Sequence, residues 1–243
     1  MDVVTALRAQ EGVTCVVGAG GKKTTMRTLA DELGRAVVTA TVRIPIFDDW
    51  VGRVVVIDDP VAALREAEGD PDAWPLGVVP EREREDRYLG YELDAIDSLA
   101  ARDVPVLVKA DGARMRRFKA PNEREPRIPR CADTVVPIAS AHVVGEPLSE
   151  GMVHRVEEVA SLTGLDPGEE IRPADVAAVL ASDDGGLKGV PDGATPIPLV
   201  NMVDDDALEA SAREIAAEIH ERADVPGVVL AEMRADEPIV DVV

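Results

Sequence analysis

The sequence VTCVVGAGGKKTT, from Val13 to Thr25, is the strongest indication of the fold. The apolar run Val13–Val17 is typical of a buried strand, and it leads through a glycine-rich turn into a helical pattern over Lys23–Leu33. Such a turn lets backbone N–H groups converge on an anion, and the N-terminus of the helix adds a favourable dipole. The stretch therefore predicts a phosphate site between a strand and a helix.

The glycine loop matches neither of two well-known nucleotide-binding patterns. It departs from G-x-x-x-x-G-K-[ST] because Lys22 stands before Lys23, and from G-x-G-x-x-G because Lys23 stands in the place of the third glycine. A tight turn with two solvated lysines is the alternative interpretation. On the phosphate interpretation, Lys22 holds the phosphates with Lys23 as second candidate, and Thr24 or Thr25 ligates Mg²⁺. The predicted cofactor-binding residues of the loop are Gly18, Gly20, Gly21, Lys22, Lys23, Thr24 and Thr25.

Strand-like runs alternate with helical patterns along the chain. This alternation predicts a single α/β domain over residues 1–243, with a mostly parallel sheet, helices on both faces and a P-loop NTPase-like fold. The expected strands are Val13–Val17, Val37–Thr41, Val54–Ile57, Val104–Val108, Thr134–Ala139, Ile197–Val200 and Gly227–Ala231. The expected helices are Lys23–Leu33, Ala62–Glu68, Glu85–Ala101, Glu150–Leu162, Ala174–Ala181 and Asp206–Arg222.

Ligands of such sheets bind beyond the carboxyl ends of the strands. This rule brings four loops to one expected cleft: Gly18–Thr25, Thr39–Pro45, Ala110–Lys119 and Asn201–Asp204.

A second motif, VLVKADGARMRRFKAPNEREPRIP, covers Val106–Pro129. Asp111 follows a buried strand, where a carboxylate can hold the water shell of Mg²⁺ or orient an attacking water in nucleotide hydrolases. Arg114 and Lys119 are candidates to neutralise developing charge. The alternative is that Asp111-Gly112 only makes a turn. The predicted catalytic residues are Asp111, Arg114 and Lys119, and the predicted metal ligands are Thr24 and Asp111.

The third element, Asn201-Met202-Val203-Asp204, resembles the Asn-Lys-x-Asp sequence with which GTP-binding proteins recognise guanine, although the lysine is absent. Asn201 and Asp204 are therefore candidate nucleotide-binding residues. The alternative is that Asp204 caps the following helix and Asn201 is a loop residue. The choice between ATP and GTP stays open.

In their order along the chain, these elements resemble the YqeC-like family, whose members are described as accessory proteins of selenium-dependent molybdenum hydroxylases. Gly18, Gly20, Gly21 and Lys22 match the GAGGKT loop of that family; Asp111, Gly112, Lys119, Pro121, Glu125 and Pro126 match its second run; His154 and Arg155 match its His-Arg pair. Lys23 replaces the usual Thr or Ser, and Lys109 replaces a Glu. The resemblance implies a P-loop-like nucleotide-binding fold and a role in maturing a molybdenum enzyme, with that hydroxylase or its cofactor-synthesis proteins as partners.

Composition limits the partners and the setting. The 47 acidic and 26 basic residues give a net charge of −21, which disfavours nucleic acid and anionic membranes as partners. The acids are spread from Asp2 to Asp241, as in a halophilic protein whose self-repulsion is screened by salt. Neither a signal peptide nor an apolar stretch of membrane-spanning length is evident, so we expect a cytoplasmic protein.

Three functions are consistent with the sequence. The first is a Mg²⁺-dependent nucleotide-binding accessory protein; if it is an enzyme, it is an NTP hydrolase or phosphotransferase. The second is a non-catalytic carrier or scaffold for a phosphorylated cofactor such as a molybdopterin nucleotide. The third, a dinucleotide-dependent oxidoreductase, is disfavoured because no acidic residue ends the second strand and two lysines exceed the need of a pyrophosphate.

Overall fold

The computed structural model describes residues 1–243, and its centre is a ten-stranded sheet. The strand order is β15-β14-β13-β10-β1-β8-β2-β5-β4, and β12 pairs with β10 beside this path. Every pairing is parallel except that of β14 with β15. The strands are β1 Val13–Gly18, β2 Val37–Ala40, β4 Arg53–Val56, β5 Leu76–Val79, β8 Val106–Lys109, β10 Thr134–Ser140, β12 Thr195–Pro196, β13 Leu199–Asn201, β14 Val229–Ala231 and β15 Ile239–Val242.

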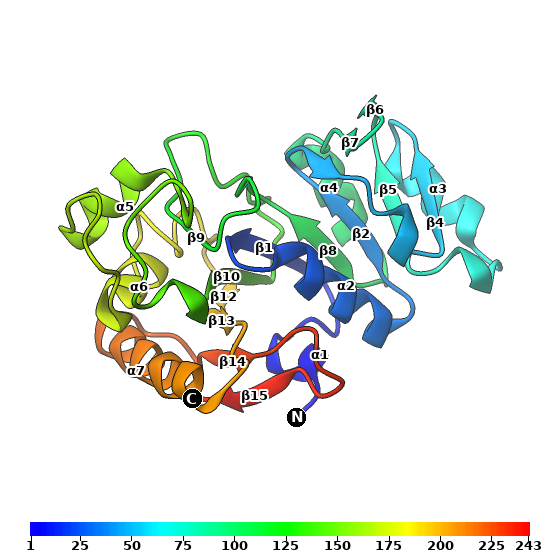
Figure 1. Cartoon of the computed structure of the whole chain (residues 1–243). Helices are drawn as coiled ribbons and strands as arrows, with labels where there is room; N and C mark the ends of the chain where they lie inside the picture. The colour runs from blue at the N-terminus through cyan, green and yellow to red at the C-terminus, as the bar shows by residue number, and fades with distance from the viewer.

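Helices cover both faces of this sheet (Figure 1). They are α1 Val3–Ala6, α2 Lys22–Leu33, α3 Pro60–Ala67, α4 Leu93–Ala100, α5 Val156–Thr163, α6 Pro173–Leu180 and α7 Asp206–Arg222, with short 3-10 turns η1 Asp48–Trp50, η2 Pro71–Ala73 and η3 Ala141–Val143. The apolar side chains of α1 and α2 pack on one face. On the other face, α3 and α4 cover one half and α5, α6 and α7 cover the other half. The predicted α/β class with a mostly parallel sheet is confirmed.

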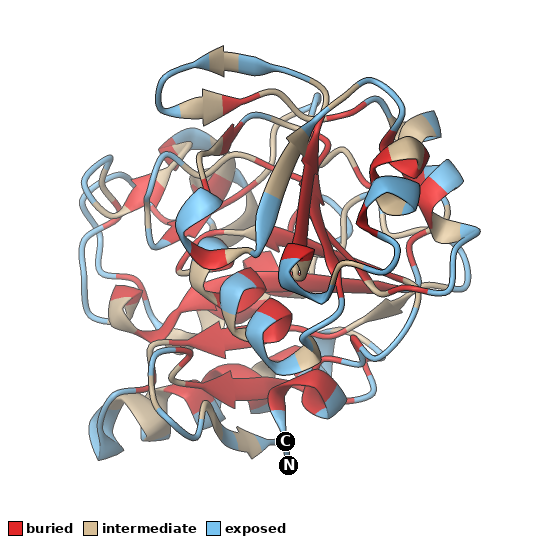
Figure 2. Ribbon diagram, turned by 90° about the vertical axis from the view of Figure 1, so that its right-hand side faces the viewer, coloured by how far each residue is buried: buried red, intermediate tan, exposed pale blue.

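The central strands are mostly apolar because both of their faces are covered. Each residue of β8 and β10 is buried, and Figure 2 shows the strands buried between helices whose outer sides are exposed. Helix α2 buries Met26, Leu29 and Ala30 against the sheet and ends at Gly34, whose φ is 64°. No helix is both long and apolar enough to cross a membrane.

The predicted helix over Glu85–Ala101 is wrong in its first half. A three-stranded sheet of β3 Ile44–Pro45, β7 Arg87–Tyr88 and β6 Arg82–Arg84 occupies this part of the chain. Tyr88 is buried there against Phe47, and its hydroxyl donates to Asp48. Only Leu93–Ala100 is helical, because tertiary packing of Tyr88 outweighs the helical apolar spacing.

The predicted helix over Glu150–Leu162 begins later, at Val156. Val153 and His154 instead form strand β11, which pairs in parallel with β9, Phe118–Lys119. Arg155 then adopts a left-handed conformation, with φ 67°, before the helix starts. Besides the short strands of the two smaller sheets, four α-helices or strands were not predicted: helix α1, strand β5, whose Gly77 weakens its strand pattern, the short strand β12 and the antiparallel edge strand β15.

Candidate functional site

The glycine loop joins β1 to α2 at the carboxyl edge of the sheet. Helix α2 has Gly21 before its first residue and no side-chain cap, and the amide of Thr25 donates to Gly21 O as the first bond of the helix. The backbone N–H groups of the first turn therefore have no helical partners. An uncapped helix start of this kind is suited to bind an anion.

Close packing explains the glycines of this loop. Gly20 has a φ of 100°, and a Cβ atom there would lie 2.5 Å from Ser140 N and 2.9 Å from Arg117 O. A side chain would therefore be strained and would collide with backbone. The amide of Ser140 donates to Arg117 O, so the end of β10 and the segment before β9 enclose the loop.

Lys22 lies beneath the loop and is only 6% exposed. Its Nζ donates a hydrogen bond to Gly18 O. It also lies 2.8 Å from Asp111 Oδ1, and the two groups form an ion pair whose angles do not meet those of a hydrogen bond. The other oxygen of Asp111, Oδ2, accepts from the amide of Gly18 at 2.8 Å. Asp111 thus ties β8 to the glycine loop and pairs with the lysine predicted to hold phosphate.

Lys119 joins the same carboxylate from a second direction. Its Nζ lies 2.9 Å from Asp111 Oδ2 and 2.8 Å from Glu125 Oε2, and it donates to Gly112 O at 2.6 Å. Glu125 Oε2 also accepts from Arg155 at 2.7 Å. The second motif and the His-Arg pair therefore meet in one chain of ion pairs that begins at Lys22.

Lys109, the last residue of β8, is a third buried lysine. Its Nζ donates to Arg43 O at 2.8 Å and to the backbone oxygen of Asp111 at 2.7 Å, without a carboxylate of its own. Burial, helped by the nearby charge of Lys22, lowers the pKa of Lys109 to about 7. Its ammonium form is therefore stabilised incompletely.

Positive charge exceeds negative charge in this cluster. The cations of Lys22, Lys119 and Arg155, together with the incompletely ionised Lys109, are accompanied only by the carboxylates of Asp111 and Glu125. Burial opposes ionisation of Asp111, yet the charges of Lys22 and Lys119 keep its pKa below the ordinary value. Since unpaired buried charge is costly, an added anion would stabilise this cluster. We call these six residues the buried lysine cluster.

The pKa values of Glu125 and His154 are both lowered by the positive charge of the cluster. Burial would raise the pKa of Glu125, but the hydrogen bond from Arg155 and the charge of Lys119 lower it to about 2. Burial, followed by the charge of Arg155, lowers the pKa of His154 to about 4, and Arg114 contributes to this shift from its exposed loop. Arg114 makes no ion pair and does not contact Asp111.

The remaining loop residues point elsewhere. Lys23 is 48% exposed, and its Nζ donates to Ile46 O at 3.2 Å and lies 3.8 Å from Asp49. Thr25 is buried and its hydroxyl donates to Gly21 O at 3.2 Å, which leaves it turned into its own helix. Thr24 is half-buried and lines the cavities beside the loop.

One of these cavities, of about 390 Å³, joins the glycine loop to the third predicted motif. Thr24 and Arg117 line its loop side, and Asn201, Asp204 and His142 line the side at the ends of β10 and β13; Met202, Glu232, Met233 and Arg234 complete it. A cavity of this size is in the range of small-ligand pockets. The structure thus brings the first and third motifs together, as the carboxyl-edge rule predicts.

Asn201 and Asp204 have different surroundings in that cavity. Asn201 is 2% exposed; its Nδ2 donates to Gly20 O at 2.8 Å, and its Oδ1 accepts from Met233 N at 3.2 Å. Asn201 therefore holds the loop in place. Asp204 is exposed and pairs with His142 at 2.6 Å, while Asp205 is the residue that caps α7. The capping role considered for Asp204 is thus wrong by one residue.

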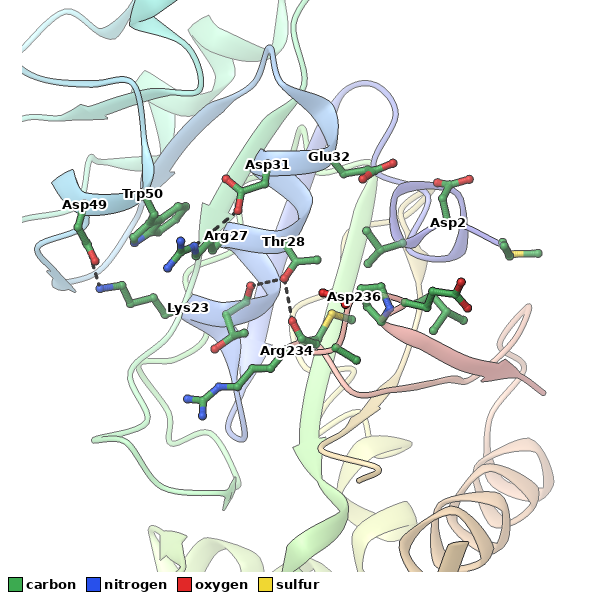
Figure 3. Close-up of a pocket in the computed structure, with 18 residues that line it drawn as sticks. Asp2, Lys23, Arg27, Thr28, Asp31, Glu32, Asp49, Trp50, Arg234 and Asp236 are labelled. Atoms are coloured by element: carbon green, nitrogen blue, oxygen red, sulfur yellow. Dashed lines mark hydrogen bonds and ion pairs between the residues drawn. The ribbon is translucent and has the colours of Figure 1, made fainter. Parts of the chain in front are cut away.

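A larger cavity, of about 1050 Å³, lies along the outer side of α2 (Figure 3). Lys23 is directed toward Asp49 on one wall, and Arg234 comes from the segment after β14. Trp50 lines the cavity and its buried Nε1 has no hydrogen-bond partner. The acidic lining residues Asp2, Asp31, Glu32, Asp49, Asp236 and Glu237 outnumber the basic ones, so this cavity attracts phosphate less than the buried lysine cluster does.

The predicted Mg²⁺ ligands Thr24 and Asp111 lie in different surroundings, and their metal-binding role stays a prediction. Both oxygens of Asp111 contact lysine ammonium groups, and Thr24 lines a cavity that Asp111 does not line. The protein contains no group of three or more His, Cys, Asp or Glu side chains placed to hold a metal ion. A divalent cation would have to replace lysines at Asp111 against the repulsion of those that remain.

Several residues of the site could not be singled out by motif reasoning. Arg117 and Arg234 line the 390 Å³ cavity, but neither belongs to a nucleotide-binding pattern. Lys109 was noted as one of five lysines and as a departure from the family pattern, but the bond from its Nζ to the backbone of Asp111 was not predicted. The low lysine content, five residues of which Lys22, Lys109 and Lys119 meet at Asp111, was the available signal.

Comparison with known proteins relates most of the chain to one family. A family model described as YqeC protein matches residues 14–157, which include the glycine loop and the buried lysine cluster. The uncharacterized protein YqeC of Escherichia coli (strain K12) is 31% identical over 195 residues, 78% of this chain and 75% of that protein. No solved structure matches the chain.

Proposed function

The chain belongs to the YqeC family, and from that premise we propose that it binds the phosphates of a nucleotide at the glycine loop. The observation that carries the proposal is the excess of buried positive charge beside an uncapped helix start. Lys22 and Lys119 share one carboxylate, Asp111, directly beneath the loop. Phosphate is the common biological anion that both a helix N-terminus and lysine ammonium groups bind well.

The nucleotide enters from the 390 Å³ cavity in this proposal. Thr24 and Arg117, which line this cavity, would face the phosphates, and Asp204 and His142, which also line it, would face the nucleoside. Lys22 would turn from Asp111 toward the phosphates. An exposed carboxylate such as that of Asp204 can accept N–H donors of guanine, which favours GTP over ATP as the first ligand to test.

The proposed biological role is the maturation of a molybdenum hydroxylase, which rests on the family resemblance. Whether the nucleotide is hydrolysed depends on Asp111, Arg114 and Lys119, the predicted catalytic residues. Because Asp111 is held by two lysines and Arg114 is exposed away from it, the geometry favours binding over turnover. The second candidate, a carrier of a phosphorylated cofactor, is therefore equally consistent with this site.

Calorimetric titration with ATP and GTP in molar KCl, with phosphate release followed in parallel, tests the proposal. Saturable binding that weakens by about 10- to 100-fold in Lys22→Ala is the expected result. Lys188→Ala is the matched control, since Lys188 donates to Asn122 O outside the cluster and its loss should leave binding unchanged. Turnover would identify an NTP hydrolase, and binding without turnover a carrier. A folded protein that binds neither nucleotide would contradict the proposal.

A further inference from the structure

We propose that this phosphate site works without a divalent metal ion, because buried lysines supply the positive charge that a metal supplies elsewhere. The inference rests on the proposed function and specifies its chemistry. Lys22, Lys109 and Lys119 all place Nζ within 2.9 Å of an atom of Asp111. These lysines come from the start of α2, the end of β8 and strand β9, so three separate elements converge on one point.

The charge balance of the buried lysine cluster favours an anion over a cation as its ligand. With Arg155, the lysines of the cluster outnumber its two carboxylates, and all of these groups are buried or nearly so. A metal-free polyphosphate would neutralise more of this surplus than its Mg²⁺ complex, which carries two negative charges fewer. In a weakly screened interior, like charges at such distances repel strongly. The geometry therefore favours an anion alone.

Asp111 acts in this site as an internal substitute for phosphate. Its carboxylate accepts a hydrogen bond from the Gly18 amide and contacts the ammonium groups of Lys22 and Lys119. Backbone amides and ammonium groups are also the donors that bind phosphate oxygens. A bound phosphate would take Lys22 from Asp111, so the carboxylate competes with the ligand. A metal-binding carboxylate would have the opposite effect and support the ligand.

The first test measures binding of tripolyphosphate, ATP and GTP to the whole wild-type chain in molar KCl, once with EDTA and once with Mg²⁺. We expect dissociation constants in EDTA within about threefold of those in Mg²⁺, or tighter. Binding that weakens by about tenfold or more in EDTA would overturn the metal-free site and leave the proposed function intact. Binding in neither buffer would instead contradict the proposed function and the inference with it.

The second test uses Asp111→Asn, which removes the competing charge and retains the shape. We expect tripolyphosphate in EDTA to bind Asp111→Asn at least as tightly as the wild type, and to raise its melting temperature by more. A folded Asp111→Asn protein that no longer binds tripolyphosphate would show that Asp111 supports the ligand, as a metal ligand does, and would overturn the inference. If the variant does not fold, the wild-type comparison of EDTA with Mg²⁺ decides.

Discussion

Lys22 and Lys23 are neighbours in the sequence, yet they belong to two different regions of the molecule. Lys22 is 6% exposed and lies among residues from β1, β8 and β9, whereas Lys23 is 48% exposed and contacts η1 beside the larger cavity. Successive residues of a helix point about 100° apart, so one faces inward and the other outward. Two identical side chains thus lie in different surroundings, one buried among charged groups and the other exposed to solvent.

The two regions differ in whether water can replace a lost contact. Around Lys22 each charge is buried with few partners, and removal of one leaves another unpaired. Around Lys23 water can replace any lost contact. Buried pairs therefore respond strongly to single substitutions, and exposed pairs respond weakly.

The largest expected effect is that of Asp111→Leu on stability. The substitution leaves Lys22 and Lys119 buried without their shared carboxylate, and breaking a buried pair in this way costs about 3–5 kcal/mol. The measurement is the free energy of unfolding from guanidinium denaturation in molar KCl. Asp49→Leu, beside Lys23, is the comparison and should cost far less; equal losses would remove the distinction between the two regions.

A second effect of similar size concerns pH at Glu125. The pKa of Glu125 is lowered from 4.5 to about 2 in the folded protein, so its ionised form stabilises the fold above pH 4.5. This contribution is lost as the pH falls from about 4.5 through about 2. The pKa difference corresponds to about 3–4 kcal/mol, which the partial exposure of Glu125 reduces to on the order of 2–3 kcal/mol. Glu125→Gln should be less stable at pH 7 and should lose less stability on acidification. Parallel pH profiles for both proteins would contradict the ion-pair chain.

The third effect is on nucleotide binding. Loss of one charge-assisted hydrogen bond costs about 1.5–3 kcal/mol, so we expect Lys22→Ala to weaken binding by about 10- to 100-fold. Lys23→Ala should change it by less than about threefold. Calorimetry on both variants makes the comparison. The reverse order would shift the phosphate lysine from Lys22 to Lys23.

The smallest effect is on the stability of Lys23→Ala. The contact of Lys23 with Asp49 is 3.8 Å long and exposed, and such pairs contribute about 0–1 kcal/mol. Denaturation of this variant should coincide with that of the wild type within about 0.5 kcal/mol. A larger loss would mean that the cavity wall of Figure 3 depends on this contact more than its exposure indicates.

Much of the fold followed from local patterns. The helix over Asp206–Arg222 was predicted with its observed bounds, because its apolar face and its Glu-Arg pairs four residues apart are local features. The strand before the glycine loop was also predicted from a local feature, its run of apolar residues. The helix predicted at Glu85 failed because Tyr88 is held by Phe47 and Asp48, which lie some forty positions earlier.

The candidate site was predictable in its members and not in its contacts. Asp111 and Lys119 were predicted as a metal ligand or water-orienting group and a neutralising cation, but their pairing with each other and with Lys22 was not. Asn201 was a candidate for base recognition. In the structure its side-chain amide donates to Gly20 O and so holds the glycine loop. The nucleotide-binding assignments of the loop residues stay predictions until binding is measured.

By itself the sequence determined the strand–glycine–helix unit, the alternation that builds a parallel sheet, and the residues that relate the chain to the YqeC family. The tertiary structure alone decided which of two adjacent lysines is buried and what it faces. Gly18 and Asp111 are 93 positions apart and meet because β8 pairs directly with β1. Strand order depends on packing of the whole core, which no local pattern encodes, and burial then turns ordinary side chains into a strongly coupled charge cluster.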